Sequence, residues 1–261
     1  MKYLLTALTL AGLLVPAGVL AESPEEKGLA IAIEDDKRDN GFQDYQADMV
    51  MVLTNRSGEE AKRQIHTKNM EVDGDGDKSL VIFNEPRDVK GTALLNFSHK
   101  TETDDQWLYL PALKRVKRIS SANKSGSFMG SEFAYEDITS QEVEKYTYKW
   151  LRDEELEGLP VFVFERYPAY EYSGYTRQIV WLDKKEYRPL KIEYYDKKKT
   201  LLKTQTFSGY KQYLDKYWYP DEMHMENHQT GKKTTLFWSN YKFRVGFKSR
   251  DFNKNSLKRA R

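Results

Sequence analysis

The sequence predicts a mainly β protein, and three observations support that prediction. Apolar and polar residues alternate with a period of two in many segments, turn-forming residues recur between those segments, and a clear helix pattern occurs only near residue 23. Because a parallel return needs a crossover of about a dozen residues, such short turns favour antiparallel strands. We therefore predict one large curved sheet or open barrel.

Residues 1–21 have the features of a secretory signal peptide. Met1 and Lys2 form a short basic start, the apolar run Tyr3–Val15 is too short to span a bilayer, and Ala21 ends a small-residue motif that signal peptidase recognises. An uncleaved anchor is the alternative, but no basic cluster follows. The chain has no cysteine, so it carries no lipid-modified cysteine and no disulfide. We expect cleavage after Ala21 and a single periplasmic domain over residues 22–261.

Charge and composition narrow the classes of partner. The formal net charge is +2, which predicts no general attraction to nucleic acid. The 18 Tyr, 12 Phe and 5 Trp are large apolar side chains, many with a polar tip, and they suit a sheet with one wet face or a lined cavity.

One helix is predicted at the start of the mature chain. Ser23 is a natural N-cap, Pro24 stands at the first helical position, and Glu26 completes a capping box. The helix is expected to end near Asn40 and Gly41. Its apolar stripe is predicted to contain Leu29, Ala30, Ala32 and Ile33.

Strands are predicted from Phe42 onward. Residues 47–53, 146–150 and 241–247 alternate, and the stretches NRSGEE, DGDGDK, ELEGLP, YDKKKT and HQTGKK supply hairpin-type turns. Residues 80–83, 161–164 and 179–182 are apolar on both faces. A strand of that kind needs cover on each side, from the first helix, a second layer, a lid or a ligand.

Metal and catalytic patterns are weak in this chain. Asp73, Asp75 and Asp77 begin like a calcium loop, but an EF-hand needs Gly and Glu where Lys78 and Asn84 stand. His224 and His228 lie on one strand face about 13 Å apart at ~3.3 Å per residue, which is too far to share one ion on a straight strand. No nucleophile or phosphate-loop motif occurs, and the abundant carboxylates leave a glycosidase pair open. We predict no metal, no cofactor and no catalytic residue.

Four basic residues follow an apolar segment: Lys114, Arg115, Lys117 and Arg118. They could contact an anionic headgroup or an acidic partner. The other interpretation is a solvated edge strand whose charges prevent edge-to-edge pairing.

Four long segments resemble the outer membrane lipoprotein-sorting protein group, the LolA-like branch of periplasmic proteins. They are WLYLPALKRVKRIS, SGSFMGSEFAYED, GYTRQIVWLDKKEYRPLKIEYYD and NHQTGKKTTLFWSNYKF. The resemblance implies an incomplete, half-open antiparallel β-barrel of about eleven strands around an apolar cavity, with a helix or loop as a lid. The segment EVDGDGDKSLVIFNEPRDVKG departs from the lipoprotein carrier's KRP motif, so that carrier's functional arginine has no counterpart here.

The resemblance also implies a function and partners. It implies a carrier that shelters the acyl chains of a lipid or lipidated protein between the two membranes, in transient membrane contact and accessory to an inner-membrane exporter. A non-carrying adaptor that docks on such an exporter is the alternative, and an enzyme is the third. We expect the cavity or lid to contain Trp107, Tyr109, Phe128, Met129, Phe133 and Tyr135, with Gly126 and Gly130 as lid hinges.

Overall fold

The structure is a computed structural model and describes residues 22–259. The predicted signal peptide, residues 1–21, lies outside the described residues. Thirteen strands form one open antiparallel sheet, in the order β6-β5-β4-β3-β2-β1-β15-β14-β11-β10-β9-β8-β7, so that β6 and β7 are its edges. The prediction of a half-open β-barrel is confirmed, and its sheet has thirteen strands where about eleven were predicted.

The first half of the sheet is a meander of hairpins, joined to the second half where β1 pairs with β15. This pairing brings together segments from opposite ends of the chain. The strands of this half are β1 (Asp44–Thr54), β2 (Glu60–Met70), β3 (Lys78–Glu85), β4 (Ala93–Phe97), β5 (Asp105–Leu110), β6 (Arg115–Ile119) and β15 (Lys233–Phe243).

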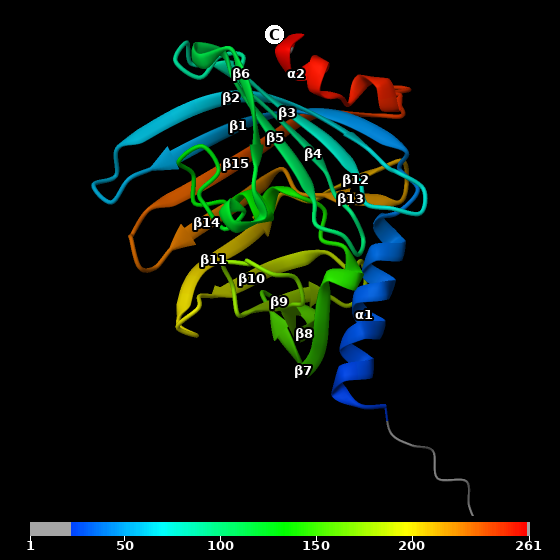
Figure 1. The fold of residues 1–261 in the computed structure, drawn as a ribbon. Coiled ribbons are helices and arrows are strands. Elements are labelled where there is room, and N and C mark those ends of the chain that lie inside the picture. Colours follow the sequence, from blue (N-terminus) through cyan, green and yellow to red (C-terminus); the bar gives the residue numbers. More distant parts are fainter. Residues whose placement is uncertain (1–21, 260–261) are drawn as a thin grey trace, which may run out of the picture.

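The second half is a further antiparallel series that curls under the first (Figure 1). Bulges interrupt the register, for example between Trp150 and Arg152 of β7 and between Pro189 and Lys191 of β10, and bulges increase the local twist of a sheet. The strands are β7 (Tyr146–Leu156), β8 (Leu159–Pro168), β9 (Arg177–Asp183), β10 (Pro189–Tyr195), β11 (Leu201–Ser208) and β14 (Glu222–Asn227), with a separate hairpin of β12 (Lys211–Tyr213) and β13 (Tyr217–Tyr219).

Helix α1 (Pro24–Asp39) begins and ends as the sequence predicts. The Ser23 side chain accepts from the backbone N–H of Glu26, the Glu26 carboxylate accepts from the backbone N–H of Ser23, and Asn40 is the C-cap. The predicted apolar stripe is correct at Ala32 but wrong at Leu29, Ala30 and Ile33. Gly28, Ile31 and Ala32 are buried, whereas Leu29 and Ile33 are 43% and 51% exposed.

Gly28 explains which face of α1 is buried. A Cβ at this position would lie 2.8 Å from the backbone nitrogen of Trp150, so the helix approaches β7 more closely than any side chain allows. Lys27 then lies over the Trp150 ring at 3.6 Å. A close backbone approach, and not the largest apolar side chains, therefore orients the helix.

A second helix, α2 (Lys254–Arg259), was not predicted and covers the outer face of the first half of the sheet (Figure 1). Phe252 and Leu257 are buried against Leu80, Ile82, Leu95 and Trp107. This helix supplies the outer cover that the doubly apolar residues 80–83 require. The short 3-10 turns are η1 (Pro111–Leu113), η2 (Ser121–Asn123), η3 (Tyr135–Ile138), η4 (Val143–Lys145) and η5 (Ser249–Asp251).

The main core lies on the inner face of the curved sheet. It joins Met51 and Phe83 from the first half to Phe164 and Leu182 from the second. A chain segment between β6 and β7, here called the inner loop (residues 124–142), lies between the two halves in Figure 1. No helix within residues 22–259 is long and apolar enough to cross a bilayer.

Candidate functional site

A cavity of about 1090 Å³ opens beside the inner loop. This volume is slightly above the ~300–1,000 Å³ that small-molecule sites occupy. One of its walls is the inner face of the second half of the sheet, which points apolar and aromatic side chains into the space. They include Tyr148, Phe164, Val180, Leu182, Ile192, Tyr194, Phe207 and Met223.

The opposite side of the cavity is polar. The C-terminal half of α1 contributes Asp35 and Asp39, and the turn between β2 and β3 contributes Asp73 and Asp77. Burial in the cavity wall raises the pKa of Asp35 to about 7 and that of Asp77 to about 7. The cavity is therefore amphipathic, with an apolar wall facing an acidic one.

The inner loop is packed into the concave core and does not project into solvent. Phe128 is fully buried, Phe133 is 3% exposed, and the Phe128 ring lies 5.7 Å from Phe83 and 5.5 Å from Tyr135. The left-handed backbone of Met129 and Gly130 makes the tight turn that directs Phe128 inward.

Buried polar contacts attach this loop to the second half of the sheet. Lys203 of β11 donates to the Asp137 carboxylate at 2.7 Å and to the backbone oxygen of Glu132 at 2.9 Å, and both charged side chains are at most 5% exposed. The Tyr175 hydroxyl also donates to Asp137, at 2.9 Å. Because each charge is paired and hydrogen-bonded, the loop is held in one position across the cavity's end.

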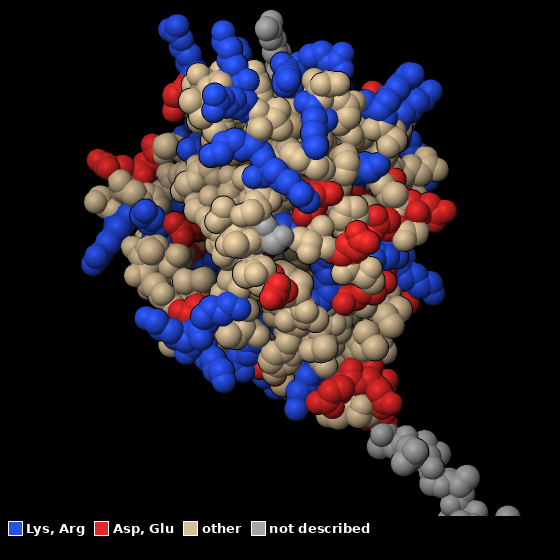
Figure 2. Space-filling model, viewed as in Figure 1, with Lys and Arg blue, Asp and Glu red and all other residues tan. Residues whose placement is uncertain are grey.

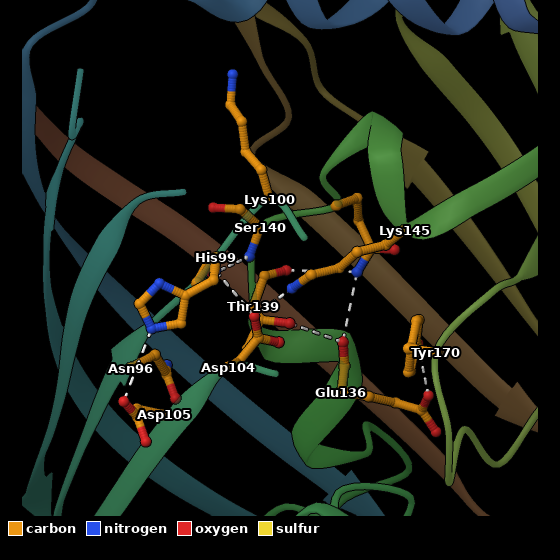
Figure 3. Close-up of polar contacts among 12 residues, drawn as sticks. Asn96, His99, Lys100, Asp104, Asp105, Glu136, Thr139, Ser140, Lys145 and Tyr170 are labelled. Carbon is orange, nitrogen blue, oxygen red and sulfur yellow. Dashed lines mark hydrogen bonds and ion pairs between the residues drawn. The ribbon is translucent and has the colours of Figure 1, made fainter. Parts of the chain in front are cut away.

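A second set of contacts holds the end of the loop (Figure 3). Glu136 accepts hydrogen bonds from the Tyr170 and Ser173 hydroxyls at 2.8 and 2.7 Å. Lys145 pairs with Asp104, and Lys124 donates to the backbone oxygen of Asp104 at 2.7 Å. Burial raises the pKa of Glu136 and lowers that of Lys124.

Two predicted cavity residues need correction. Trp107 and Tyr109 lie on the outer face of β5, beneath α2, while Leu108 of the same strand points into the inner core. Trp107 lines a separate groove of about 400 Å³ with Phe97, Phe252 and Lys254. The strand is apolar on both faces, so its side-chain pattern could not show which face is inner.

The other four predicted residues lie on the inner loop and not on the cavity wall. Phe128 and Phe133 are buried core residues, and Met129 and Tyr135 pack beside them. The inner loop reaches the cavity through its last residues, among them Asp137, Gln141 and Glu142. The hinge role of Gly126 and Gly130 stays a prediction; Gly130 has φ of 79°, whereas a Cβ at Gly126 would approach the backbone oxygen of Asn123 at 3.1 Å.

The basic cluster lies on the edge strand of the sheet, as one interpretation required. Arg115, Lys117 and Arg118 are exposed on β6, which pairs only with β5, and Lys114 occupies the left-handed turn before it. Arg118 pairs with Asp105. Figure 2 shows Lys and Arg side chains gathered at the top of the molecule, where Figure 1 places β6 and α2.

The residues considered for metal binding have other partners. His224 and His228 hydrogen-bond to the hydroxyls of Thr235 and Thr204, at 2.9 and 2.8 Å, and Asp75 binds His99 at 2.7 Å. Within residues 22–259 no three such side chains come together in a way that could hold an ion.

The acidic wall was missed because its residues are far apart in sequence. Asp35 and Asp39 are four apart on a helix and therefore share a face, which is a signal that could have been read. Their position opposite Asp77 and Glu142 depends on the tertiary fold.

A half-open antiparallel barrel around an amphipathic cavity defines a class of ligand-enclosing carriers. The chain is 60% identical to an outer membrane lipoprotein-sorting protein domain from Vibrio parahaemolyticus, with a TM-score of 0.88, over 90% of this chain and 99% of that one. It is 33% identical to a DUF1329 family protein from Desulfovibrio piger, with a TM-score of 0.86, over 90% of this chain and 99% of that one. The chain belongs to the same family as these two proteins, the outer membrane lipoprotein-sorting protein family.

Three further comparisons complete this picture. A LolA superfamily protein from Nitrosomonas europaea shares the fold at 21% identity and a TM-score of 0.71, over 88% of this chain and 98% of that one. A protein-family model described as that of an uncharacterized protein matches residues 75–259. No curated protein matches the chain. The Vibrio relative that shows the family is described as a sorting protein domain and not as an enzyme.

Proposed function

We propose that this protein is a periplasmic carrier that shelters the acyl chains of a lipid or lipidated protein between the inner and outer membranes. The observation that carries the proposal is the cavity of about 1090 Å³ with its apolar wall. Each CH₂ group removed from water there contributes about 0.8 kcal/mol, so one or two acyl chains bind without any catalytic group. The name of the Vibrio relative, an outer membrane lipoprotein-sorting protein domain, supports the same function.

In this proposal residues 1–21 direct export and are removed, and residues 22–261 form the mature carrier. The inner loop acts as the lid, with Gly126 and Gly130 as its hinges. Phe128 and Phe133 fill the end of the concave core when the lid is in place, and cargo entry loosens them. The lid is thus an internal plug held by Lys203 and Glu136 and not a flap over the mouth.

The exposed basic edge supports docking at an anionic surface during loading. Lys114, Arg115, Lys117 and Arg118 would contact lipid headgroups or an inner-membrane exporter of the resistance-nodulation-division or mycobacterial-type large membrane protein class. The alternative, an adaptor that docks there without carrying cargo, rests on this exposed edge alone. Reversing all four charges should abolish co-purification with the exporter in either case, so that experiment tests docking and not carriage.

Carriage is tested by filling the cavity. Met223→Trp places a bulky ring at the apolar wall, whereas Phe237→Trp alters the outer face of the neighbouring strand, where Phe237 is 43% exposed. The first variant should lose binding of fluorescent fatty acids and release co-purified lipid in native mass spectrometry, and the second should keep both. Lipid-free native protein that also ignores the probes would refute the carrier and leave the adaptor.

The lid role has its own measurement. Amides of residues 126–133 should exchange hydrogen faster in lipid-free protein than in the loaded or closed state. Equal protection with and without lipid would assign the inner loop a structural role only.

A further inference from the structure

The charge of the cavity wall is strongly one-sided. Eleven acidic side chains line the cavity against four basic ones, so the space repels anions unless its carboxylates are occupied. Acidic side chains are visible to the right of centre in Figure 2, near the upper end of α1 in Figure 1. The question is which of these carboxylates are already satisfied by the protein.

Several of these carboxylates already have hydrogen-bond or ion-pair partners within the protein. Glu71 accepts from the backbone N–H groups of Gly41 and Gln43, at 2.6 and 2.5 Å, and Asp75 accepts from His99. Asp137 is paired with Lys203. These groups hold turns and the inner loop in place and are not available to a ligand.

Glu142 is different. It is 7% exposed, it lines the cavity, and no hydrogen bond from any residue of the described chain reaches its carboxylate. The backbone of Gly76 packs against it so closely that a Cβ there would lie 2.8 Å from Glu142 Oε1. Burial raises the pKa of Glu142, and a positively charged group in the cavity would favour its ionised form.

Neighbouring groups reinforce this position. The negative charge of Asp77 faces that of Glu142, and repulsion adds to burial in raising the pKa of Asp77 to about 7. The pKa of Asp35 is also about 7, through burial and the nearby charge of Asp39. The C-terminal end of α1 faces the same space, where the helix dipole favours a cation.

The basic side chains of the lining are too few to balance this wall, and most of them have partners of their own. Arg38 is bound to Glu34 at 2.8 Å, and Lys216 donates to the backbone oxygen of Asn40. Arg166 donates to Gln178 and lies over the Tyr146 ring. At Glu142, the charges of Lys145, which is already paired with Asp104, and of Lys100 favour the ionised carboxylate, but burial outweighs them and raises its pKa.

We propose that the cavity selects an acylated molecule whose polar head carries an ammonium-type cation. The apolar wall takes the chain, and Glu142, Asp77 and Asp35 take the head. This inference rests on the proposed carrier function and adds the class of cargo to it.

Probes with the same dodecyl chain and different heads test the proposal. Dodecylammonium and dodecanoyl-lysyl-lysine amide carry cationic heads, as an amino lipid and as a basic lipopeptide respectively, and dodecanoate is anionic. Their affinities for the full mature chain are measured by calorimetry at pH 8 and low salt, below micelle formation. At least one cationic probe should bind about tenfold tighter than dodecanoate. Tighter binding of dodecylammonium would indicate an amino lipid as cargo, and tighter binding of dodecanoyl-lysyl-lysine amide would indicate a basic lipopeptide.

Charge-neutral variants complete the test. Asp77→Asn combined with Glu142→Gln should remove the preference, whereas Glu155→Gln with Glu157→Gln, an equal charge change on the exposed β7–β8 turn, should keep it. Asp35→Asn alone should reduce it in part and serves if the double variant unfolds. Equal binding of all probes, or a preference that survives in Asp77→Asn/Glu142→Gln, overturns the cationic cargo and leaves the carrier intact. No binding of any probe overturns the carrier itself.

Discussion

Replacement of Lys203 by Met tests whether the inner loop is held by its buried ion pair. The variant keeps a side chain of similar length but leaves Asp137, which is 5% exposed, with only neutral donors from Tyr175 and Ala134. The backbone oxygen of Glu132 also loses its donor, which alone costs about 1 kcal/mol or more. Together with the unpaired carboxylate, the expected loss in the free energy of loop closure is about 3–5 kcal/mol.

Hydrogen exchange followed by mass spectrometry measures this loss at the loop itself. A change of about 3 kcal/mol corresponds to more than a hundredfold faster exchange, because each 1.4 kcal/mol is a factor of about ten. The effect should be confined to residues 124–142 and should appear at denaturant concentrations where the sheet is still folded.

Two controls isolate the cause. Lys233→Met removes an ion pair with Glu226 whose side chains are 42% and 39% exposed, and it should cost about 1 kcal/mol or less. Lys203→Met combined with Asp137→Leu removes both charges and should recover much of the stability lost by Lys203→Met alone. Unchanged exchange in Lys203→Met, or a double variant as unstable as the single one, would refute the role of the pair.

Three further predictions concern stability. Folding raises the pKa values of Asp35 and Asp77 from 3.8 to about 7, so between these pH values the folded state binds more protons than the unfolded state. Stability should therefore fall as pH rises through that range. Thermal melts should show a higher Tm at pH 5 than at pH 8, and Asp35→Asn/Asp77→Asn should make Tm depend less on pH. Gly28→Ala should lower the free energy of unfolding, measured in urea, by about 1–3 kcal/mol because the added methyl group meets the Trp150 backbone. Leu29→Ala, on the exposed face of α1, should change it little. A Gly28→Ala variant as stable as the wild type would contradict the close approach of α1 to β7. Phe252→Ala should lower the free energy of unfolding by about 3 kcal/mol and expose the α2 segment to proteolysis. If the variant resists protease as well as the wild type does, α2 is held by other contacts.

The local chemistry of the chain was enough to predict the sheet and its turns. Alternation at residues 47–53 gives β1, whose Ala47, Met49 and Met51 are buried on one face, and the turn-forming stretches lie between the strands as expected. The capping box of Ser23 and Glu26 located the start of α1, because a cap depends only on neighbouring residues. The basic residues of β6 indicated an edge strand, because charged side chains on an edge discourage pairing with a strand of another molecule.

Other features depend on contacts between distant segments. The face of β5 that carries Trp107 points outward only because α2, about 150 residues later, covers it, and both faces of the strand are apolar. The orientation of α1 depends on how closely Gly28 approaches β7, which an amphipathic pattern does not record. The acidic wall joins Asp35, Asp77 and Glu142 from a helix, a hairpin turn and a loop. Periodicity reports which residues of one element share a face, but the curvature of the whole sheet and the pairing of β1 with β15 decide which of those faces meet around the cavity.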